Sequence, residues 1–170
     1  MTRLALAALL ILAADLTPIA GSDGATVTLS AGSSTARSGE LIHVTVKIQG
    51  ARDVGSVPFT LHYDPAVLEL LPTASQEGGF LKRDRTATTF LVSPGPTSRP
   101  GTVLVGLSRL GGAQSSKGAG GKGTLCRLTF RARIPGVSSL TFSKAAVMDP
   151  SANQLEATFR GTSIRVKRRT

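Results

Sequence analysis

Three residues that could form a nucleophilic site lie close together in the sequence: Ser56, His62 and Asp64. A serine attacks only when a histidine takes its proton and a carboxylate orients that histidine, so the three side chains must converge. Strand alternation turns His62 away from the core, and Asp64 falls in the Asp-Pro turn that ends the strand. The other histidine, His43, is predicted to face solvent on a different strand. We therefore expect no enzymatic activity.

Metal and phosphate sites are disfavoured by a shortage of ligands. Asp64 with Glu69, or Asp149 with Asn153, could offer oxygens to calcium, which takes roughly six to eight. Turn capping explains both aspartates better. The glycine-rich segment 111–123 lacks two defining residues of a phosphate-binding loop, and a strand is predicted to follow it. We expect a flexible loop there, no metal ion and no cofactor.

Arg127, Arg131 and Arg133 form the strongest electrostatic feature, because residues two apart on a strand share a face. Two interpretations remain open: a soluble sheet surface protected from edge pairing, or a site for an anionic ligand. The formal charge of +10 favours acidic partners, although its residues are dispersed along the chain. Nucleic-acid binding is not expected, since stacking aromatic residues beside the charge are missing.

The elements that must position these residues are strands. A chain of 170 residues with only 4% aromatic residues and no tryptophan suits one all-β domain of short strands. Segment 41–49 alternates most clearly, with apolar residues inward and polar residues outward. Glycine and proline turns separate nine expected strands: 25–30, 41–49, 56–63, 67–73, 86–93, 102–110, 124–134, 138–148 and 162–166. This pattern predicts a two-sheet β-sandwich.

The N-terminal residues predict export. Residues 1–21 resemble a signal peptide, with a basic start, an apolar run and small residues at their end. A native apolar strand or an uncleaved anchor is the alternative, and the latter would give the only membrane contact. Residues 22–25 are predicted as linker, 26–166 as the sandwich and 167–170 as a basic tail. The expected location is secreted, extracellular or at the cell surface, or periplasmic in a Gram-negative organism. Cys126 has no cysteine partner for a disulfide.

Several motifs resemble one family. The run 59–69 reads F-x-L-x-Y-D-P-x-V-L-E, and segments 123–130 and 136–142 have the spacing of two later strands of that family. Together they resemble the cohesin domain of bacterial cellulosome scaffoldins over residues 27–166. The resemblance implies a nine-stranded jelly-roll β-sandwich, related in fold to carbohydrate-binding modules.

The resemblance also implies a binding surface. In cohesins, the sheet of strands eight, three, six and five binds the calcium-loaded dockerin module of a partner enzyme. The corresponding residues here are Ser56, Pro58, Thr60, His62, Leu104, Gly106 and Ser108. Where enzyme-binding cohesins often carry Asn-x-Asp, this chain has Ser56-Val57-Pro58, which removes a carboxylate and a backbone donor.

The residues and the resemblance together leave two functions open. The first is an exported, non-catalytic module that docks a dockerin-bearing or other protein partner on a sheet face. The alternative is a carbohydrate-binding module for a polysaccharide, including an anionic one held by Arg127, Arg131 and Arg133. A flat cellulose-binding platform is not expected, because there is no tryptophan and most phenylalanines fall on inward faces.

Overall fold

The computed structural model describes residues 24–94, 100–110 and 117–169. These residues form strands and two one-turn 3-10 helices, η1 (Pro72–Ala74) and η2 (Arg83–Arg85). The prediction of an all-β fold is confirmed. Within the described ranges, no helix is long and apolar enough to cross a membrane.

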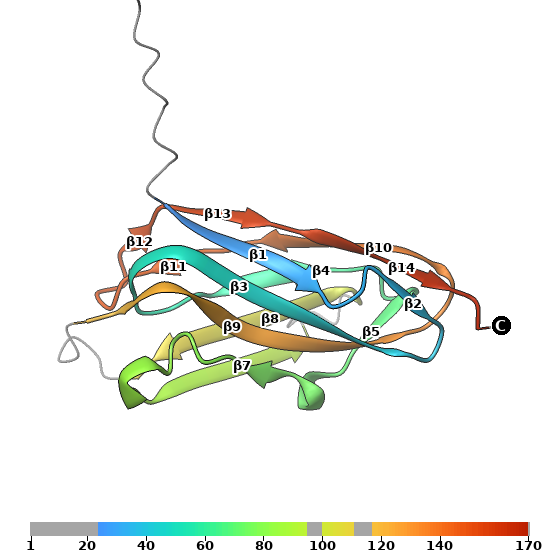
Figure 1. The fold of residues 1–170 in the computed structure, drawn as a ribbon, viewed down its shortest axis with the longest axis horizontal. Coiled ribbons are helices and arrows are strands. Elements are labelled where there is room, and N and C mark those ends of the chain that lie inside the picture. Colours follow the sequence, from blue (N-terminus) through green and yellow to red (C-terminus); the bar gives the residue numbers. More distant parts are fainter. Residues whose placement is uncertain (1–23, 95–99, 111–116, 170) are drawn as a thin grey trace, which may run out of the picture.

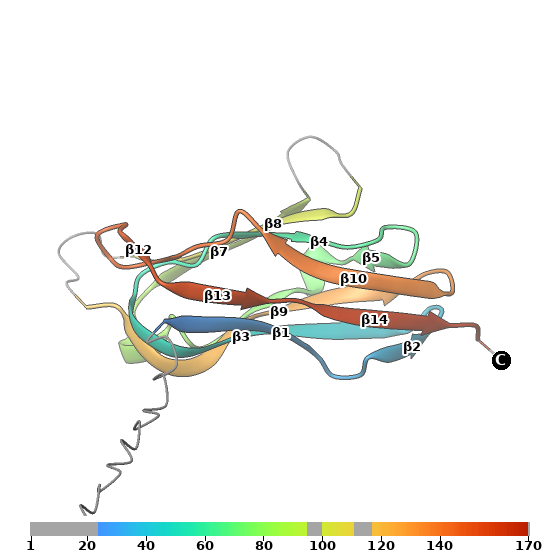
Figure 2. The same ribbon diagram turned by 90° about the horizontal axis from the view of Figure 1, so that it is seen from above.

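Two six-stranded sheets stack on each other (Figures 1 and 2). The first, the β1 sheet, has the order β13 (Ala157–Arg160), β1 (Ala25–Ala31), β3 (Leu41–Val54), β9 (Ala119–Ala132) and β5 (Leu68–Leu70), with β6 (Gln76–Glu77) also on β9. The second, the β4 sheet, has the order β2 (Thr35–Arg37), β14 (Thr162–Lys167), β10 (Gly136–Ser143), β4 (Phe59–His62), β8 (Thr102–Arg109) and β7 (Thr88–Pro94). A small ribbon pairs β11 (Val147–Met148) with β12 (Gln154–Leu155).

The chain crosses between the sheets at Gly161. β13 pairs in parallel with β1, and after this single residue β14 pairs with β10 in the other sheet. A Cβ on Gly161 would lie 2.3 Å from the carbonyl oxygen of Leu140. The crossing therefore requires glycine, because any side chain would collide with β10.

Each of the nine predicted strands has a counterpart, but several bounds differ. β9 begins at Ala119, inside the predicted loop 111–123, whose residues 111–116 lie outside the described ranges. The predicted strand 56–63 is regular only from Phe59, and 138–148 is broken after Ser143 by Lys144, which has a φ of 45°. The structure adds β2, β6, β12 and β13 to the predicted strands, and β11 is the end of the predicted strand 138–148.

The domain limits also shift by a residue. The predicted signal peptide 1–21 lies outside the described residues. β1 begins at Ala25, the start of the predicted strand 25–30 and the last residue of the predicted linker, and β14 ends at Lys167, the first residue of the predicted basic tail.

Alternate side chains of the strands fill the space between the sheets. On β3, Ile42, Val44, Val46 and Ile48 are all buried, as predicted. Alternation along the predicted strand 124–134 places Ile134 inward and Thr129 on the outer face, but the burial of both differs from this expectation. Ile134 is 55% exposed because the strand ends before it, and Thr129, predicted to face outward, is only 1% exposed. The η1 turn covers Thr129, whose hydroxyl donates to the carbonyl of Ala74 at 2.9 Å.

A covering segment after η1 adds to the core. Phe80 and Leu81, which lie between the predicted strands 67–73 and 86–93, are each 1% exposed. They are held by two backbone bonds to β9: Gly78 donates to Leu125 at 2.8 Å, and Phe80 donates to Thr124 at 3.0 Å. A Cβ on Gly78 would lie 2.1 Å from the Thr124 carbonyl oxygen, whereas a Cβ on Gly79 would meet nothing within 4 Å.

We predict that Gly78→Ala lowers the free energy of unfolding by more than about 2 kcal/mol, because the added methyl group forces the covering segment off β9. The matched variant Gly79→Ala should change it by less than about 1 kcal/mol. Urea unfolding of both variants measures the difference. Equal stability of the two would contradict the close approach of Gly78 to β9.

Cys126 is fully buried, and this burial raises the pKa of its thiol well above the usual range, with the Glu77 carboxylate adding a smaller contribution. The unfolded thiol ionises near its ordinary pKa of about 8.5, while the folded thiol keeps its proton. The unfolded state therefore binds fewer protons at alkaline pH, and stability falls as pH rises.

We predict that the unfolding free energy of the native chain drops by about 1.4 kcal/mol per pH unit above pH ~9 relative to Cys126→Ala. Urea unfolding between pH 8 and pH 10.5 would show it. Tyr63, whose pKa burial also raises, is present in both proteins, so its effect cancels in the difference. Parallel stability curves would contradict the prediction.

Candidate protein-docking face

The strands that carry the predicted binding residues are neighbours in the β4 sheet. Their order is β10, β4, β8, β7, which is the predicted order of strands eight, three, six and five. The register places Thr60 between Ser143 and Leu104, and His62 between Thr141 and Thr102. We call the outer surface of these four strands the docking face.

The predicted site residues differ in accessibility. His62 and Leu104 are exposed, and Pro58, Gly106 and Ser108 are half-buried. Thr60 is 7% exposed. Its strand is central, so its cross-strand neighbours cover it and it forms the floor of the face rather than a contact.

Ser56 lies at the edge of the docking face in a backbone pairing. It bridges Ser108 and Met148, and its N–H donates to the Met148 carbonyl at 3.1 Å. The Pro58 carbonyl accepts from Ala146 at 3.0 Å. This part of the predicted surface is therefore occupied by backbone hydrogen bonds to the segment after β10.

The centre of the docking face is apolar. Leu91 of β7 is 59% exposed and lies opposite Gly106, and Leu104 is 38% exposed. The absence of a side chain at Gly106 leaves a shallow floor beside Leu91. Leu91 was not among the predicted site residues, although alternation along the predicted strand 86–93 places it on the face opposite to the apolar Phe90 and Val92.

Hydroxyl groups surround these leucines. Where the four strands of the docking face pair with one another, their outward positions carry no charged residue. The outward residues at these positions are Thr89, Ser93, Thr102, Ser108, Thr141 and Ser143. Arg109, at the end of β8, directs its guanidinium to the Leu81 carbonyl at 2.9 Å and the Thr86 hydroxyl at 2.6 Å. The docking face is thus neutral in a chain of net charge +10.

The candidate nucleophilic residues do not assemble. Nε2 of His62 lies 2.5 Å from the hydroxyl of Ser143, not from Ser56. His62 and Ser56 are six residues apart along one extended segment, a span of roughly 20 Å. Asp64 uses Oδ1 to accept the N–H of Ala66 at 2.9 Å.

Asp149 is likewise used in a turn. Its Oδ1 accepts the N–H groups of Ser151 and Asn153, each at 2.8 Å, and its Oδ2 accepts the Asn153 amide at 2.9 Å. Hydrogen bonds from Asn153, above all from its side chain, lower the pKa of this carboxyl. Both aspartates cap turns, as predicted. In the described part of the chain no three His, Cys, Asp or Glu residues group as metal ligands would.

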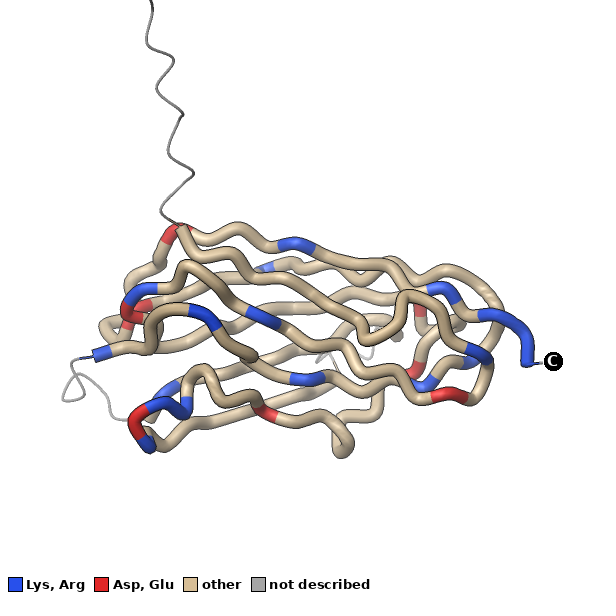
Figure 3. The backbone as a smooth tube through the Cα atoms, in the orientation of Figure 1, with Lys and Arg blue, Asp and Glu red and all other residues tan. Residues whose placement is uncertain are grey.

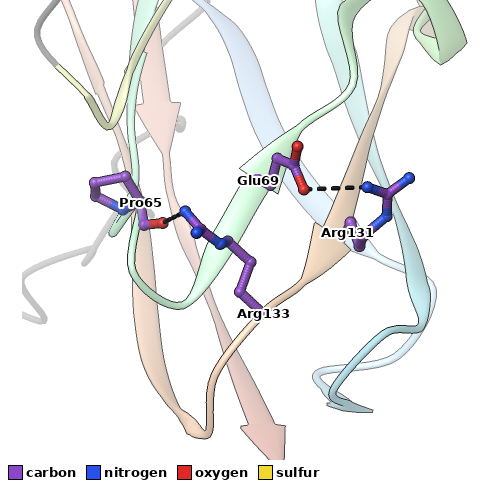
Figure 4. Close-up of polar contacts among 4 residues, drawn as sticks. All are labelled: Pro65, Glu69, Arg131 and Arg133. Atoms are coloured by element: carbon purple, nitrogen blue, oxygen red, sulfur yellow. Dashed lines mark hydrogen bonds and ion pairs between the residues drawn. The ribbon is translucent and has the colours of Figure 1, made fainter.

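The predicted arginine surface lies on the opposite, β1 sheet. Figure 4 shows that two of its three members are engaged within the protein. Arg131 is 3.3 Å from Glu69, and Arg133 donates to the Pro65 carbonyl at 3.0 Å. Arg127 is exposed. Anion binding by this trio stays a prediction, in which two guanidinium groups would have to leave existing partners.

Comparison with known proteins adds a family match. Residues 27–166 match the Cohesin domain family. A comparison with curated proteins found no significant match.

Similar solved structures include three cohesins. A non-cellulosomal cohesin from the archaeon Archaeoglobus fulgidus is 24% identical, with a TM-score of 0.63, covering 85% of this chain and 91% of that one. A type II cohesin from the Acetivibrio cellulolyticus cellulosome is 14% identical, with a TM-score of 0.70 and coverage of 83% and 95%. The cohesin of a type I cohesin–dockerin complex from Clostridium thermocellum is 15% identical, with a TM-score of 0.68 and coverage of 85% and 94%.

We predict that Thr60→Arg destabilises the fold by roughly 1–3 kcal/mol, because a long side chain must be inserted among the neighbours that cover Thr60. Leu104→Arg, on the next strand and already exposed, should cost less than about 1 kcal/mol. Thermal unfolding of the two variants tests this difference. Equal melting temperatures would contradict the placement of Thr60 in the floor.

Proposed function

The chain belongs to the cohesin family, and on this premise we propose that it docks a dockerin-type protein partner on the outer face of β10, β4, β8 and β7. Its family makes it a protein–protein interaction module. Related cohesins have been solved in complex with dockerins, including the Clostridium thermocellum pair. In this proposal the module is non-catalytic.

The observation that carries the proposal is the character of the docking face. Protein interfaces have an apolar, charge-poor centre and a polar rim. Here Leu91 and Leu104 supply exposed apolar area, and serine and threonine hydroxyls surround them. Desolvating such a surface costs less than desolvating charges, so contact with a complementary partner is favourable.

The departure at Ser56-Val57-Pro58 bears on which partner is bound. Pro58 has no N–H to offer, and the N–H of Ser56 already donates to Met148. A partner must therefore rely on the leucines, His62 and the surrounding hydroxyls rather than on a carboxylate at position 58. This favours a partner surface that is apolar at its centre.

Export belongs to the same proposal. The basic, apolar and small-residue sequence of residues 1–21 supports a signal peptide. The protein would then meet its partner outside the cytoplasm, in the medium, at the cell surface or in a periplasm.

We predict that Leu104→Arg weakens dockerin binding roughly 100-fold, because an unpaired charge is buried at the interface centre. The measurement is titration calorimetry of the full chain against a panel of calcium-loaded type I and type II dockerin modules. Thr158→Arg adds the same charge to an exposed position of the β1 sheet and should leave affinity unchanged. Binding by no dockerin would refute the partner class, and equal binding by both variants would refute the face.

A further inference from the structure

The outer surface of the β1 sheet differs from the docking face in charge. Figure 3 shows lysine and arginine positions spread over β13, β3 and β9. The strands β1, β9 and β13 contain no acidic residue. On β3 the acidic residue is Asp53, near the strand end, where it accepts the N–H of Gly118 at 2.5 Å.

Part of this surface is hollowed. A hollow of about 290 Å³ is lined by Thr28, Lys47, Gln49, Lys122 and Thr124, with Ile48 and Gly123. The pairing aligns Thr28 of β1, Lys47 of β3 and Thr124 of β9 across three adjacent strands. We call this region the lysine hollow. Its concave surface carries the ammonium groups of two lysines, the hydroxyls of two threonines and the amide of Gln49.

A bulge shapes the hollow. Val46 pairs with Cys126 but Lys47 pairs with Thr124, so Leu125 is an extra residue in β9. Both Leu125 and Cys126 are buried. A bulge bends its strand and increases the local twist. Here it lies where the hollow forms, beside Thr124.

The cations of the hollow have no ion-pair partner among the described residues. The ion pairs there are Lys82 with Glu77, at 2.8 Å, and Arg131 with Glu69. Arg160 of β13 pairs with Thr28 and so adds a fourth strand to the row of aligned residues Thr28, Lys47 and Thr124. Glu69 and Glu77 are thus neutralised by other cations, and Lys47 and Lys122 are left to attract an anion.

We propose that the lysine hollow binds an acidic polysaccharide, with uronate carboxylates on Lys47 and Lys122. The hydroxyls of Thr28 and Thr124 and the amide of Gln49 bond the sugar hydroxyls. The ammonium groups donate to carboxylates, and the threonine hydroxyls and the glutamine amide can both donate to and accept from sugar hydroxyls. No exposed aromatic or large apolar residue lines the hollow, which disfavours stacking of nucleic-acid bases or insertion into a lipid surface.

This inference is independent of the proposed dockerin partner, because the two surfaces belong to opposite sheets. Both ligands can bind at once. A module of this kind would hold its protein partner close to an anionic matrix.

Affinity electrophoresis of the full chain in gels containing polygalacturonate tests the proposal, with the fully methyl-esterified polymer as the uncharged control. We expect retardation by polygalacturonate alone. The double variant Lys47→Gln with Lys122→Gln should bind roughly tenfold more weakly. The control pair Arg165→Gln with Lys167→Gln removes the same charge from β14 and should change affinity less than about twofold.

Several results would overturn the proposal. They are no retardation of the native chain, equal retardation by the esterified polymer, or equal weakening in both variant pairs, which would mean attraction by net charge alone. Sedimentation with vesicles of anionic phospholipid is a further arm. The double variant Lys47→Gln with Lys122→Gln is measured in this assay too. If it weakens vesicle binding as strongly as it weakens polygalacturonate binding, the hollow is assigned to lipid headgroups instead.

Discussion

The structure depends on apolar contact between the inward faces of two sheets. Val44 and Leu128 of the β1 sheet, and Leu61 and Val103 of the β4 sheet, are completely buried. Burying each such side chain contributes about 1.5–3 kcal/mol against the conformational entropy of ordering the chain. Edge-to-face contacts, such as that of Tyr63 with Phe130 at 5.3 Å between ring centres, add to it. Every other residue of each strand is buried in this interior. Only the outward residues and the strand ends can therefore contact a binding partner.

The two outward faces have separate properties because they belong to different sheets, on opposite sides of the core. Every second side chain of a strand points outward. These outward residues can therefore be substituted without disturbing the packing of the inward residues. On β4, β7, β8 and β10 the outward positions hold hydroxyls, His62 and two leucines. On β1, β3, β9 and β13 they include lysines, arginines and threonines, with Leu41 and His43 at the start of β3. One sandwich therefore offers a neutral surface suited to protein contact and a cationic one suited to an anionic polymer.

Predictions from local alternation were wrong or incomplete where a distant segment covers a strand or where its register changes. Alternation placed Thr129 outward, correctly in direction, but the η1 turn from 55 residues earlier closes over it. Phe80 and Leu81 have no strand period around them, and only their bonds to β9 bring them into the core. The bulge at Leu125 buries two successive residues, which no period of two predicts. Segment 119–123 is rich in glycine, and it is strand because β3 pairs with it.

The sequence alone determined nine of the strands, the inward residues of β3 and most of those of β9, and, through its motifs, the family and the order of the four strands of the docking face. These depend on local alternation and on turn residues, which a short stretch of chain contains in full. Tertiary structure decided which outward side chains can be reached and which charges are paired. Thr60 and Leu104 have the same orientation but only one is accessible, and Arg131 has an ion-pair partner among the described residues while Lys47 has none there. Alternation determines which face of the sheet a side chain points to. Its burial and its ion-pair or hydrogen-bond partners depend on residues far away in the chain.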